Sequence, residues 1–248
     1  MKVVTWNCGG GFRDKFKIIE KLEADVYVIQ ECENPDLSSN GDYKSWANGR
    51  RAWVGKPGKK GLGIFTSKLP LEALNWEKSF NWPNVKNISE SDDPRYFLPC
   101  RFDNKVNLLG VWAHRGSIHK YRYIGQVWGY LQINKTNLAT SETLILGDFN
   151  SNKIWDVERA KAQWTHSDVV RELNDIGFKS LYHELGKGVE QGEEVVNTFY
   201  SYRNANKPYH IDYVFGSKAI LAKKPSFNVG QFSDWIKQSD HMPIAVEF

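Results

Sequence analysis

The chain has 248 residues, of which 41% are hydrophobic and 25% charged, an ordinary composition for a globular protein and enough for one large α/β domain. No apolar run approaches the ~20 residues of a membrane span, which argues against a membrane protein. The formal charge of +4 is compatible with a polyanionic partner but too mild to require one. We therefore expect a single domain over residues 1–248, monomeric and not bound to membranes.

The N-terminus and the cysteines indicate the compartment. Residues 2–7 read directly as a strand, without a charged leader, apolar segment or small-residue cleavage site. Cys8, Cys32 and Cys100 have neither an even count nor zinc-type spacing, which favours free thiols in a reducing compartment. We expect a cytoplasmic location.

The first part of the chain predicts a β-α-β opening. Val3–Trp6 has the pattern of a strand, Arg13–Leu22 that of an amphipathic helix, and Asp25–Gln30 that of a buried strand. Gly61–Thr66 predicts a further strand.

In the middle of the chain, two strands are predicted over Tyr96–Phe102 and Val106–Ala113, joined by a turn at Asp103 and Asn104. Tyr121–Leu138 has helical spacing. Thr143–Leu146 then predicts a short buried strand.

A helix is predicted over Ser167–Leu173, with Ser167 or Asp168 near its N-cap and Gly177 near its end. Because Ser167 can cap a helix, we interpret the polar cluster His166–Asp168 as structural.

The remaining segments complete the fold class. Val195–Tyr202 and His210–Phe215 alternate like paired strands, and Ile244–Phe248 predicts a last strand. Strands outnumber helices and the helices fall between them, so we expect two packed mixed β-sheets flanked by helices.

Short polar clusters abut the predicted strands at positions far apart in the chain. Strand ends can deliver carboxylates, amides and an imidazole to one metal-dependent, phosphate-cleaving site. The clusters are Asn7, Gln30–Glu31, Gly147–Asn150 and Ser239–His241.

Five motifs occur in the order and approximate spacing of the endonuclease/exonuclease/phosphatase superfamily, which the chain resembles over nearly its whole length. The chain looks like a compact member, similar to the exonuclease III and deoxyribonuclease I type. The resemblance implies a four-layer α/β sandwich with the site at one end of two facing sheets, and phosphoester hydrolysis that depends on Mg²⁺ or Mn²⁺. The motifs are Thr5–Asn7, Gln30–Glu31, Gly147–Asn150, His210–Tyr213 and Ser239–Pro243.

Glu31 is our first choice of metal ligand. A carboxylate at the end of a buried strand is costly unless it is paired or bound to a cation, and hard divalent ions prefer oxygen ligands. An ion pair with a strand neighbour is the structural alternative. The resemblance makes Asp240 a second acidic ligand.

Asp148 and Asn150 lie two residues apart in a turn, so both side chains can face one phosphate. The resemblance implies that Asp148 aligns or deprotonates the attacking water and that Asn150 helps to position it. An Asx-turn is the structural alternative.

The resemblance pairs the Asp212 carboxylate with the His241 imidazole, which can then bind a phosphoryl oxygen as negative charge builds. Whether His241 acts as base, acid or electrostatic clamp stays open. His114 is assigned to phosphate or transition-state contact, and Asn7 to the phosphate or to the support of Glu31.

Two positions depart from the family pattern. Exonuclease III-like members have an aspartate two residues after the first asparagine, where this chain has Gly9, so one auxiliary metal contact is in doubt. His210 stands where apurinic-site nucleases commonly have arginine, which weakens an apurinic-site role.

Two basic, aromatic stretches, residues 50–60 and 114–130, combine cations that bind phosphates with rings that stack on bases. A solvated loop and an amphipathic helix face are the plainer interpretations. The substrate-binding candidates are Arg51, Trp53, Lys59, Lys60 and Arg115.

The sequence thus predicts a metal-dependent phosphodiester hydrolase, with nucleic acid and most of all DNA as the substrate. One alternative is a phosphatase or phosphodiesterase that acts on small molecules or nucleotides, because this fold hosts such activities too. A binding module that has lost catalysis is the second alternative.

Overall fold

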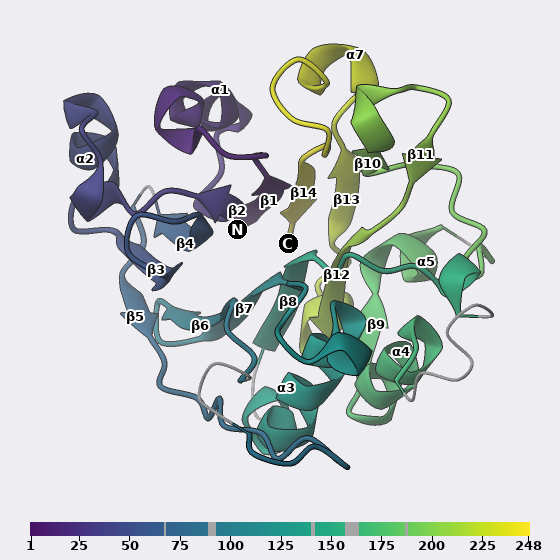
Figure 1. The fold of residues 1–248 in the computed structure, drawn as a ribbon. Coiled ribbons are helices and arrows are strands. Elements are labelled where there is room, and N and C mark those ends of the chain that lie inside the picture. Colours follow the sequence, from purple (N-terminus) through teal and green to yellow (C-terminus); the bar gives the residue numbers. More distant parts are fainter. Residues whose placement is uncertain (67, 89–92, 140–141, 157–163, 187) are drawn as a thin grey trace.

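The structure is a computed structural model that describes residues 1–66, 68–88, 93–139, 142–156, 164–186 and 188–248. Two six-stranded sheets and one two-stranded ribbon form the β-structure of these residues (Figure 1). None of the helices in these ranges has the length and apolar character needed to cross a bilayer. Cys8, Cys32 and Cys100 are buried free thiols, as predicted.

The first sheet contains both chain termini. β1 and β2 are parallel neighbours, and every other pair in this sheet is antiparallel. Across the sheet the strands are β13 (Ser226–Val229), β14 (Ile244–Glu247), β1 (Lys2–Asn7), β2 (Val26–Cys32), β4 (Gly61–Thr66) and β3 (Arg51–Gly55).

The second sheet has the same mixed character, with β7 and β8 as its parallel pair and α3 (Ile124–Leu138) between them in the chain. The predicted turn between β6 and β7 is confirmed: Asp103 and Asn104 have φ of 49° and 53°, as type I′ hairpins require. The strand order is β5 (Leu71–Ala73), β6 (Phe97–Phe102), β7 (Val106–Trp112), β8 (Glu142–Asp148), β12 (Asp212–Ser217) and β9 (Phe178–Ser180).

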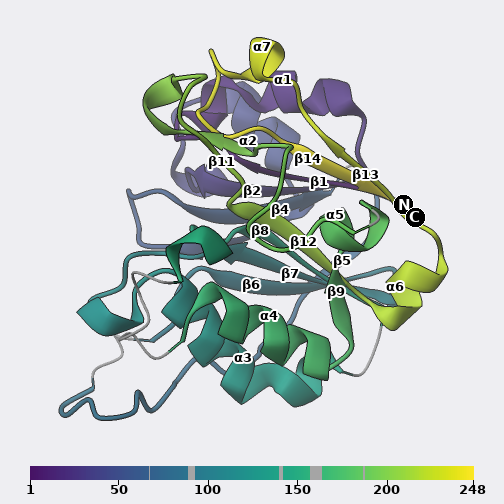
Figure 2. The ribbon, with the colours of Figure 1, turned by 90° about the vertical axis from the view of Figure 1, so that its right-hand side faces the viewer.

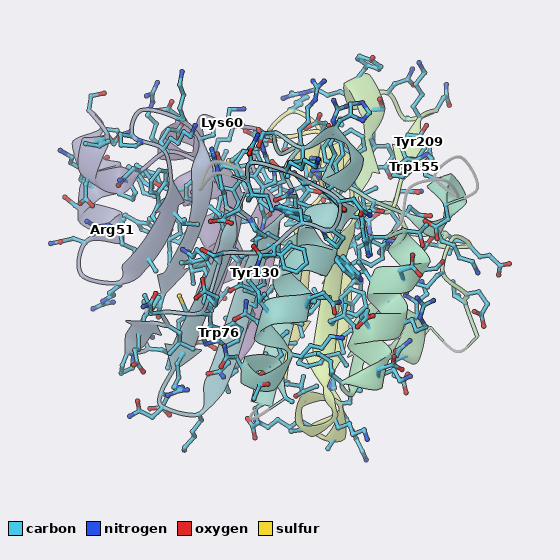
Figure 3. All side chains as sticks on the ribbon, turned by 60° about the horizontal axis from the view of Figure 1, so that its bottom comes forward. Arg51, Lys60, Trp76, Tyr130, Trp155 and Tyr209 are labelled. Atoms are coloured by element: carbon cyan, nitrogen blue, oxygen red, sulfur yellow. The ribbon has the colours of Figure 1, made fainter. Side chains whose placement is uncertain are left out.

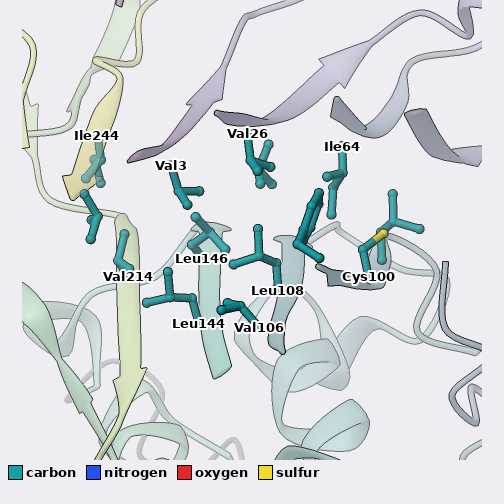
Figure 4. Packing of buried hydrophobic residues seen from close by; sticks show 14 of the residues in the cluster. Val3, Val26, Ile64, Cys100, Val106, Leu108, Leu144, Leu146, Val214 and Ile244 are labelled. Atoms are coloured by element: carbon teal, nitrogen blue, oxygen red, sulfur yellow. The ribbon is translucent and has the colours of Figure 1, made fainter. Parts of the chain in front are cut away.

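The two sheets pack face to face over an aliphatic core (Figure 4). Val3 and Val26 of the first sheet face Leu108 and Leu146 of the second. Their chain neighbours point to the outer faces and are buried under helices, which explains why these strands are nearly continuous hydrophobic runs.

Helices cover the outer face of each sheet (Figure 2). The first sheet is covered by α1 (Phe16–Ile19), α2 (Gly41–Ala47) and α7 (Phe232–Trp235). The second is covered by α3 and α4 (His166–Asp175). The shorter α5 (Leu181–Leu185) and α6 (Lys218–Ala222) contact β12. The predicted four-layer α/β sandwich is confirmed.

Three local predictions need correction, the first in the opening β-α-β unit. The helix expected over Arg13–Leu22 is reduced to the four residues of α1 between 3-10 turns at Phe12–Asp14 and Glu20–Leu22. At the junction Lys15 has φ of −116° and ψ of −10°, far from the ideal φ of an α-helix, so the periodic apolar pattern does not form one regular helix.

The predicted pairing of Val195–Tyr202 with His210–Phe215 is wrong. Only β10 (Phe199–Tyr200) forms in the first segment, and its partner is β11 (Pro208–Tyr209). β12 lies instead between β8 and β9. Alternation indicates a strand but does not choose its neighbour.

The third correction concerns segment boundaries. Part of the basic stretch 50–60 is the edge strand β3, which pairs with β4.

The predicted helix α4 is capped by Thr165, not by Ser167 or Asp168, and Asp168 is the N3 member of a capping box. That structural role for the cluster agrees with our interpretation, and Gly177 follows the helix with φ of 88°.

Candidate active site

Two carboxylates meet where β8 ends and β12 begins. Asp148 and Asp212 are direct partners in the antiparallel register and are 0% and 3% exposed. Gly147 has φ of 141°, and a Cβ on it would lie 1.9 Å from the carbonyl oxygen of Val111. Only glycine therefore lets β7 approach β8 closely enough to support this arrangement.

His241 completes this buried group from the loop before β14. Its Nδ1 lies 2.9 and 3.2 Å from the two carboxylate oxygens of Asp212. An ionised carboxylate only accepts hydrogen bonds, so Nδ1 donates. Ligand atoms of Asp148, Asp212 and His241, here called the buried trio, lie within 4.8 Å of one another, close enough to hold a metal ion.

Burial and charge shift the pKa values within the buried trio. Burial alone would lower the pKa of His241, but the charge of Asp212 and its hydrogen bond outweigh burial and raise this pKa to about 9. Burial raises the pKa of Asp148 to about 7, against the opposing effects of the imidazolium and of hydrogen bonds from Asn7 and Asn150. The trio thus places an imidazolium beside a carboxyl group that can exchange a proton near neutral pH.

Asn7, at the end of β1, links the buried trio to Glu31. Its Nδ2 donates to Asp148 Oδ2 at 2.9 Å and to Glu31 Oε1 at 3.2 Å. Its Oδ1 accepts from the Gly9 amide at 3.0 Å, which fixes the side-chain orientation. One amide therefore sets the spacing between carboxylates that belong to different sheets.

Asn150 adopts φ of 47° just after β8. Its backbone N–H donates to Asp148 Oδ1 at 2.8 Å, the Asx-type contact of the structural alternative. Its side-chain Nδ2 donates to Asp148 Oδ2 at 2.8 Å and to the Ala113 carbonyl at 3.1 Å. The turn orients the same carboxylate that Asn7 contacts, so the local turn and the site are one structure.

Glu31 lies at a β-bulge. The register of β2 and β4 shifts between Gln30 and Cys32, and Glu31 has a left-handed φ of 61°. Its side chain is 24% exposed and lies 2.7 Å, Oε2 to Nζ, from Lys60. A strained backbone that turns one carboxylate toward solvent is typical of a functional position.

Asp240 approaches the same loop from the other side. A Cβ on Gly9 would lie 3.7 Å from Asp240 Oδ1, and the Gly9 carbonyl accepts from Lys60 Nζ at 3.4 Å. Glu31, Asp240 and Lys60 thus gather around the loop after β1, and we call them the open half of the site.

His114 follows β7, where the Ala113 amide donates to the Asp148 carbonyl at 2.7 Å. Its ring centroid lies 5.1 Å from that of Tyr96 and 5.5 Å from that of Trp112. Burial, Arg95 and Lys56 lower the pKa of His114, which favours the neutral imidazole. Its Nδ1 accepts from the Gly116 amide at 3.2 Å, which leaves Nε2 to meet a ligand.

Two of the substrate-binding candidates, Arg51 and Lys60, lie well apart in Figure 3. Lys60 joins the open half, whereas Arg51, at the edge of the first sheet in Figure 3, pairs with Asp36. Trp53 Nε1 donates to the Cys32 carbonyl at 3.3 Å. Lys59 and Arg115 are exposed. Apart from Lys60, none of these contacts connects a candidate to the buried trio or to Glu31, and their substrate roles stay predictions.

Two hydroxyls hold the site together without having been predicted to do so. Thr198 Oγ1 accepts from the amides of Ile211 and Asp212, both at 3.0 Å. Ser239 Oγ donates to the Asn7 carbonyl at 2.7 Å and accepts from the His241 amide at 3.1 Å. Ser239 stands in a recognised motif, but an isolated threonine gives no signal in the sequence.

Lys15 supports the open half through hydrogen bonds of its ammonium group. Its Nζ donates to three carbonyl oxygens, of Cys8 at 2.6 Å, Gly10 at 2.7 Å and Gln238 at 2.6 Å. One ammonium thus joins the loop after Asn7 to the loop that carries Asp240. Its place in a predicted amphipathic helix gave no indication of this role.

The fold and the arrangement of these side chains match a known protein family. The model of the Endonuclease/Exonuclease/phosphatase family matches residues 4–241, and the chain belongs to this family. Its members are phosphoesterases and nucleases that depend on divalent metal ions. No curated protein sequence matches the chain significantly.

Solved structures with the same fold cover the whole chain. The 3′ phosphatase NExo from Neisseria, bound to a product DNA hairpin, is 18% identical with a TM-score of 0.68, over 100% of this chain and 99% of that one. An AP endonuclease from Archaeoglobus fulgidus is 16% identical with a TM-score of 0.67, over the same shares. At these identities the likeness is one of fold.

Proposed function

We propose that the protein is a divalent-metal-dependent phosphodiester hydrolase that cleaves DNA by activated-water attack at phosphorus. One observation carries the proposal: the Asn7 amide connects Glu31, a partly exposed carboxylate, to Asp148, which faces the Asp212–His241 pair. Packing alone gives no reason to bury three ionisable groups together at the end of two sheets.

The residues of the open half fit a divalent cation. Glu31 already holds a positive charge, the Lys60 ammonium, at 2.7 Å, and the carboxylate of Asp240 lies at the same loop. Oxygen ligands with access to water are what Mg²⁺ and Mn²⁺ prefer. Glu31 and Asp240 would hold the ion, which when bound polarises the phosphoryl group and stabilises the leaving oxygen.

The buried trio suits proton transfer better than metal binding. Nδ1 of His241 is engaged with Asp212, so a metal there would have to displace that hydrogen bond. We assign Asp148 to the attacking water, whose proton it accepts, and the His241 imidazolium to the phosphoryl oxygen on which charge builds. Asn7 and Asn150 orient Asp148, and Asp212 holds the imidazole.

The surroundings of His114 favour an extended substrate. A cavity of about 330 Å³ opens beside it, lined by Lys56, Arg95, Tyr96 and Trp112 among others. A second cavity, of about 540 Å³, shares Lys56, Asp93, Arg95 and Tyr96 with the first. Two cations beside aromatic rings, next to the cleavage position, suit a neighbouring phosphate and base of a nucleic acid.

A panel of labelled substrates tests the proposal. We expect cleavage of DNA to stop in excess chelator and to return with Mg²⁺ or Mn²⁺, and KM for DNA to rise steeply with salt. Unchanged cleavage in chelator would remove the metal from the mechanism. Preferred hydrolysis of a phosphomonoester or free nucleotide, with a KM insensitive to salt, would replace DNA by a small-molecule substrate.

A further inference from the structure

Lys60 has contacts that ordinary surface lysines lack. It ends the turn that leads into β4, and its Nζ lies 2.7 Å from Glu31 Oε2 and 3.4 Å from the Gly9 carbonyl oxygen. Its side chain remains 49% exposed, so the ammonium can leave this position without unfolding anything. Lys59, its neighbour, is exposed and has the same charge.

The glycines after Asn7 leave room for this ammonium. A Cβ on Gly10, whose φ is 83°, would lie 2.6 Å from Lys60 Cε and 2.8 Å from its Nζ. Any side chain there would push the lysine off Glu31. Lys15, the other ammonium of this loop, is held by three carbonyls, so Lys60 is the cation of the pair that can exchange.

We propose that Lys60 is an internal counter-cation that competes with the divalent metal for Glu31. It neutralises the carboxylate until a metal binds, and metal binding must displace it. The displaced ammonium then stands at the edge of the site, free to contact a substrate phosphate. This inference rests on the proposed function in one respect, the assignment of the metal to Glu31.

Metal binding by the full-length protein, without substrate, tests the proposal. Mn²⁺ binding is measured by calorimetry and by the spin-resonance signal of free Mn²⁺, for the wild type, Lys60→Met and Lys59→Met. Both variants lose one positive charge, but only Lys60→Met breaks the contact with Glu31. We expect Lys60→Met to bind Mn²⁺ about two- to fivefold more tightly than Lys59→Met, the range of a partly exposed ion pair. Equal or weaker binding by Lys60→Met would overturn the proposal.

Glu31→Gln separates this proposal from the proposed function. If Glu31→Gln weakens Mn²⁺ binding while Lys60→Met matches Lys59→Met, only the competition by Lys60 is refuted. If Glu31→Gln leaves Mn²⁺ binding unchanged, the metal assignment itself is wrong, and the role of Lys60 is refuted with it.

Discussion

The two halves of the site are built in different ways. Asp148 and Asp212 in the buried trio are placed by strand register, and His241 by a network of hydrogen bonds, and all three are nearly inaccessible to water. In the open half, Glu31 lies on a bulge and Asp240 on a loop, with an exposed lysine as their neighbour.

This difference separates two chemical tasks. A position shielded from bulk solvent and held by strands and hydrogen bonds keeps electrostatic interactions strong and distances fixed, as proton transfer and stabilisation of a phosphoryl oxygen require. A metal ion must enter and leave with its hydration water, which an open, loop-built position permits. The comparison predicts that variants of the two halves fail for different reasons.

The largest effect is expected in the buried trio. Asp148→Asn removes the proton acceptor and should lower kcat at least ~100-fold, the lower range for a positioned acid-base group. Added metal should not restore the rate. Single-turnover cleavage measures it, with the exposed Asp234→Asn as the control. A rate within a factor of a few of wild type would remove Asp148 from the mechanism.

The next largest effect is expected on the free energy of unfolding, from the hydrogen-bond network around Glu194. Glu194 accepts hydrogen bonds from His183 at 3.1 Å and from Asn152 at 3.0 Å, and Asn152 also donates to the His210 carbonyl at 2.8 Å. Burial alone would raise the pKa of Glu194, but these bonds lower it to about 2. The network therefore ties the turn after Asp148 to the segment before Asp212.

Because this pKa is lowered below its unfolded value near 4.3, Glu194 stabilises the fold above that pH and loses its contribution as the pH falls toward 2. Glu194→Gln should cost on the order of 2 kcal/mol at pH 7, with the difference from wild type shrinking toward pH 2. Urea unfolding at several pH values measures this. A difference independent of pH would show that ionisation of Glu194 does not matter.

In the open half, Glu31→Gln should weaken metal binding about tenfold or more. Unlike Asp148→Asn, the Glu31→Gln variant should recover much of its activity at high Mn²⁺, because its defect is incomplete occupancy of the metal site. Titration of activity with Mn²⁺ distinguishes the two variants. If both variants required the same Mn²⁺ concentration for activity, the proposed division of the site would be wrong.

The smallest effect is expected at the cavity beside His114. Lys56→Met should raise KM for DNA a few-fold at low salt and reduce the slope of log KM against log salt by about one, as the loss of one phosphate contact does. Lys44→Met, on α2, is the control. Identical salt slopes in wild type and Lys56→Met would show that this cavity does not hold a phosphate.

Much of the architecture could be predicted because local chemistry determines it. The runs around Val28 and Leu146 are apolar on both faces of their strands, and Asp103 and Asn104 tolerate the left-handed turn between β6 and β7. Polar residues at strand ends, together with the family resemblance, identified the trio, Asn7 and Glu31 as candidates.

The rest depends on long-range contacts that a local pattern does not encode. The place of β12 between β8 and β9 is set by tertiary packing, and Val195, where the predicted alternation begins, is 78% exposed. The contacts of Lys60 with Glu31, of Lys15 with three carbonyls and of Thr198 with the Asp212 amide join residues brought together only by folding. The sequence around a lysine or threonine does not indicate such contacts, which are known only from the folded structure.

Anomalous diffraction from crystals grown with Mn²⁺ and inorganic phosphate tests the central claim most directly. The division of the site predicts a manganese peak bound by Glu31 in the open half, and a phosphate oxygen within hydrogen-bonding distance of His241. A manganese peak inside the buried trio, bound by Asp148, Asp212 and His241, would contradict the account.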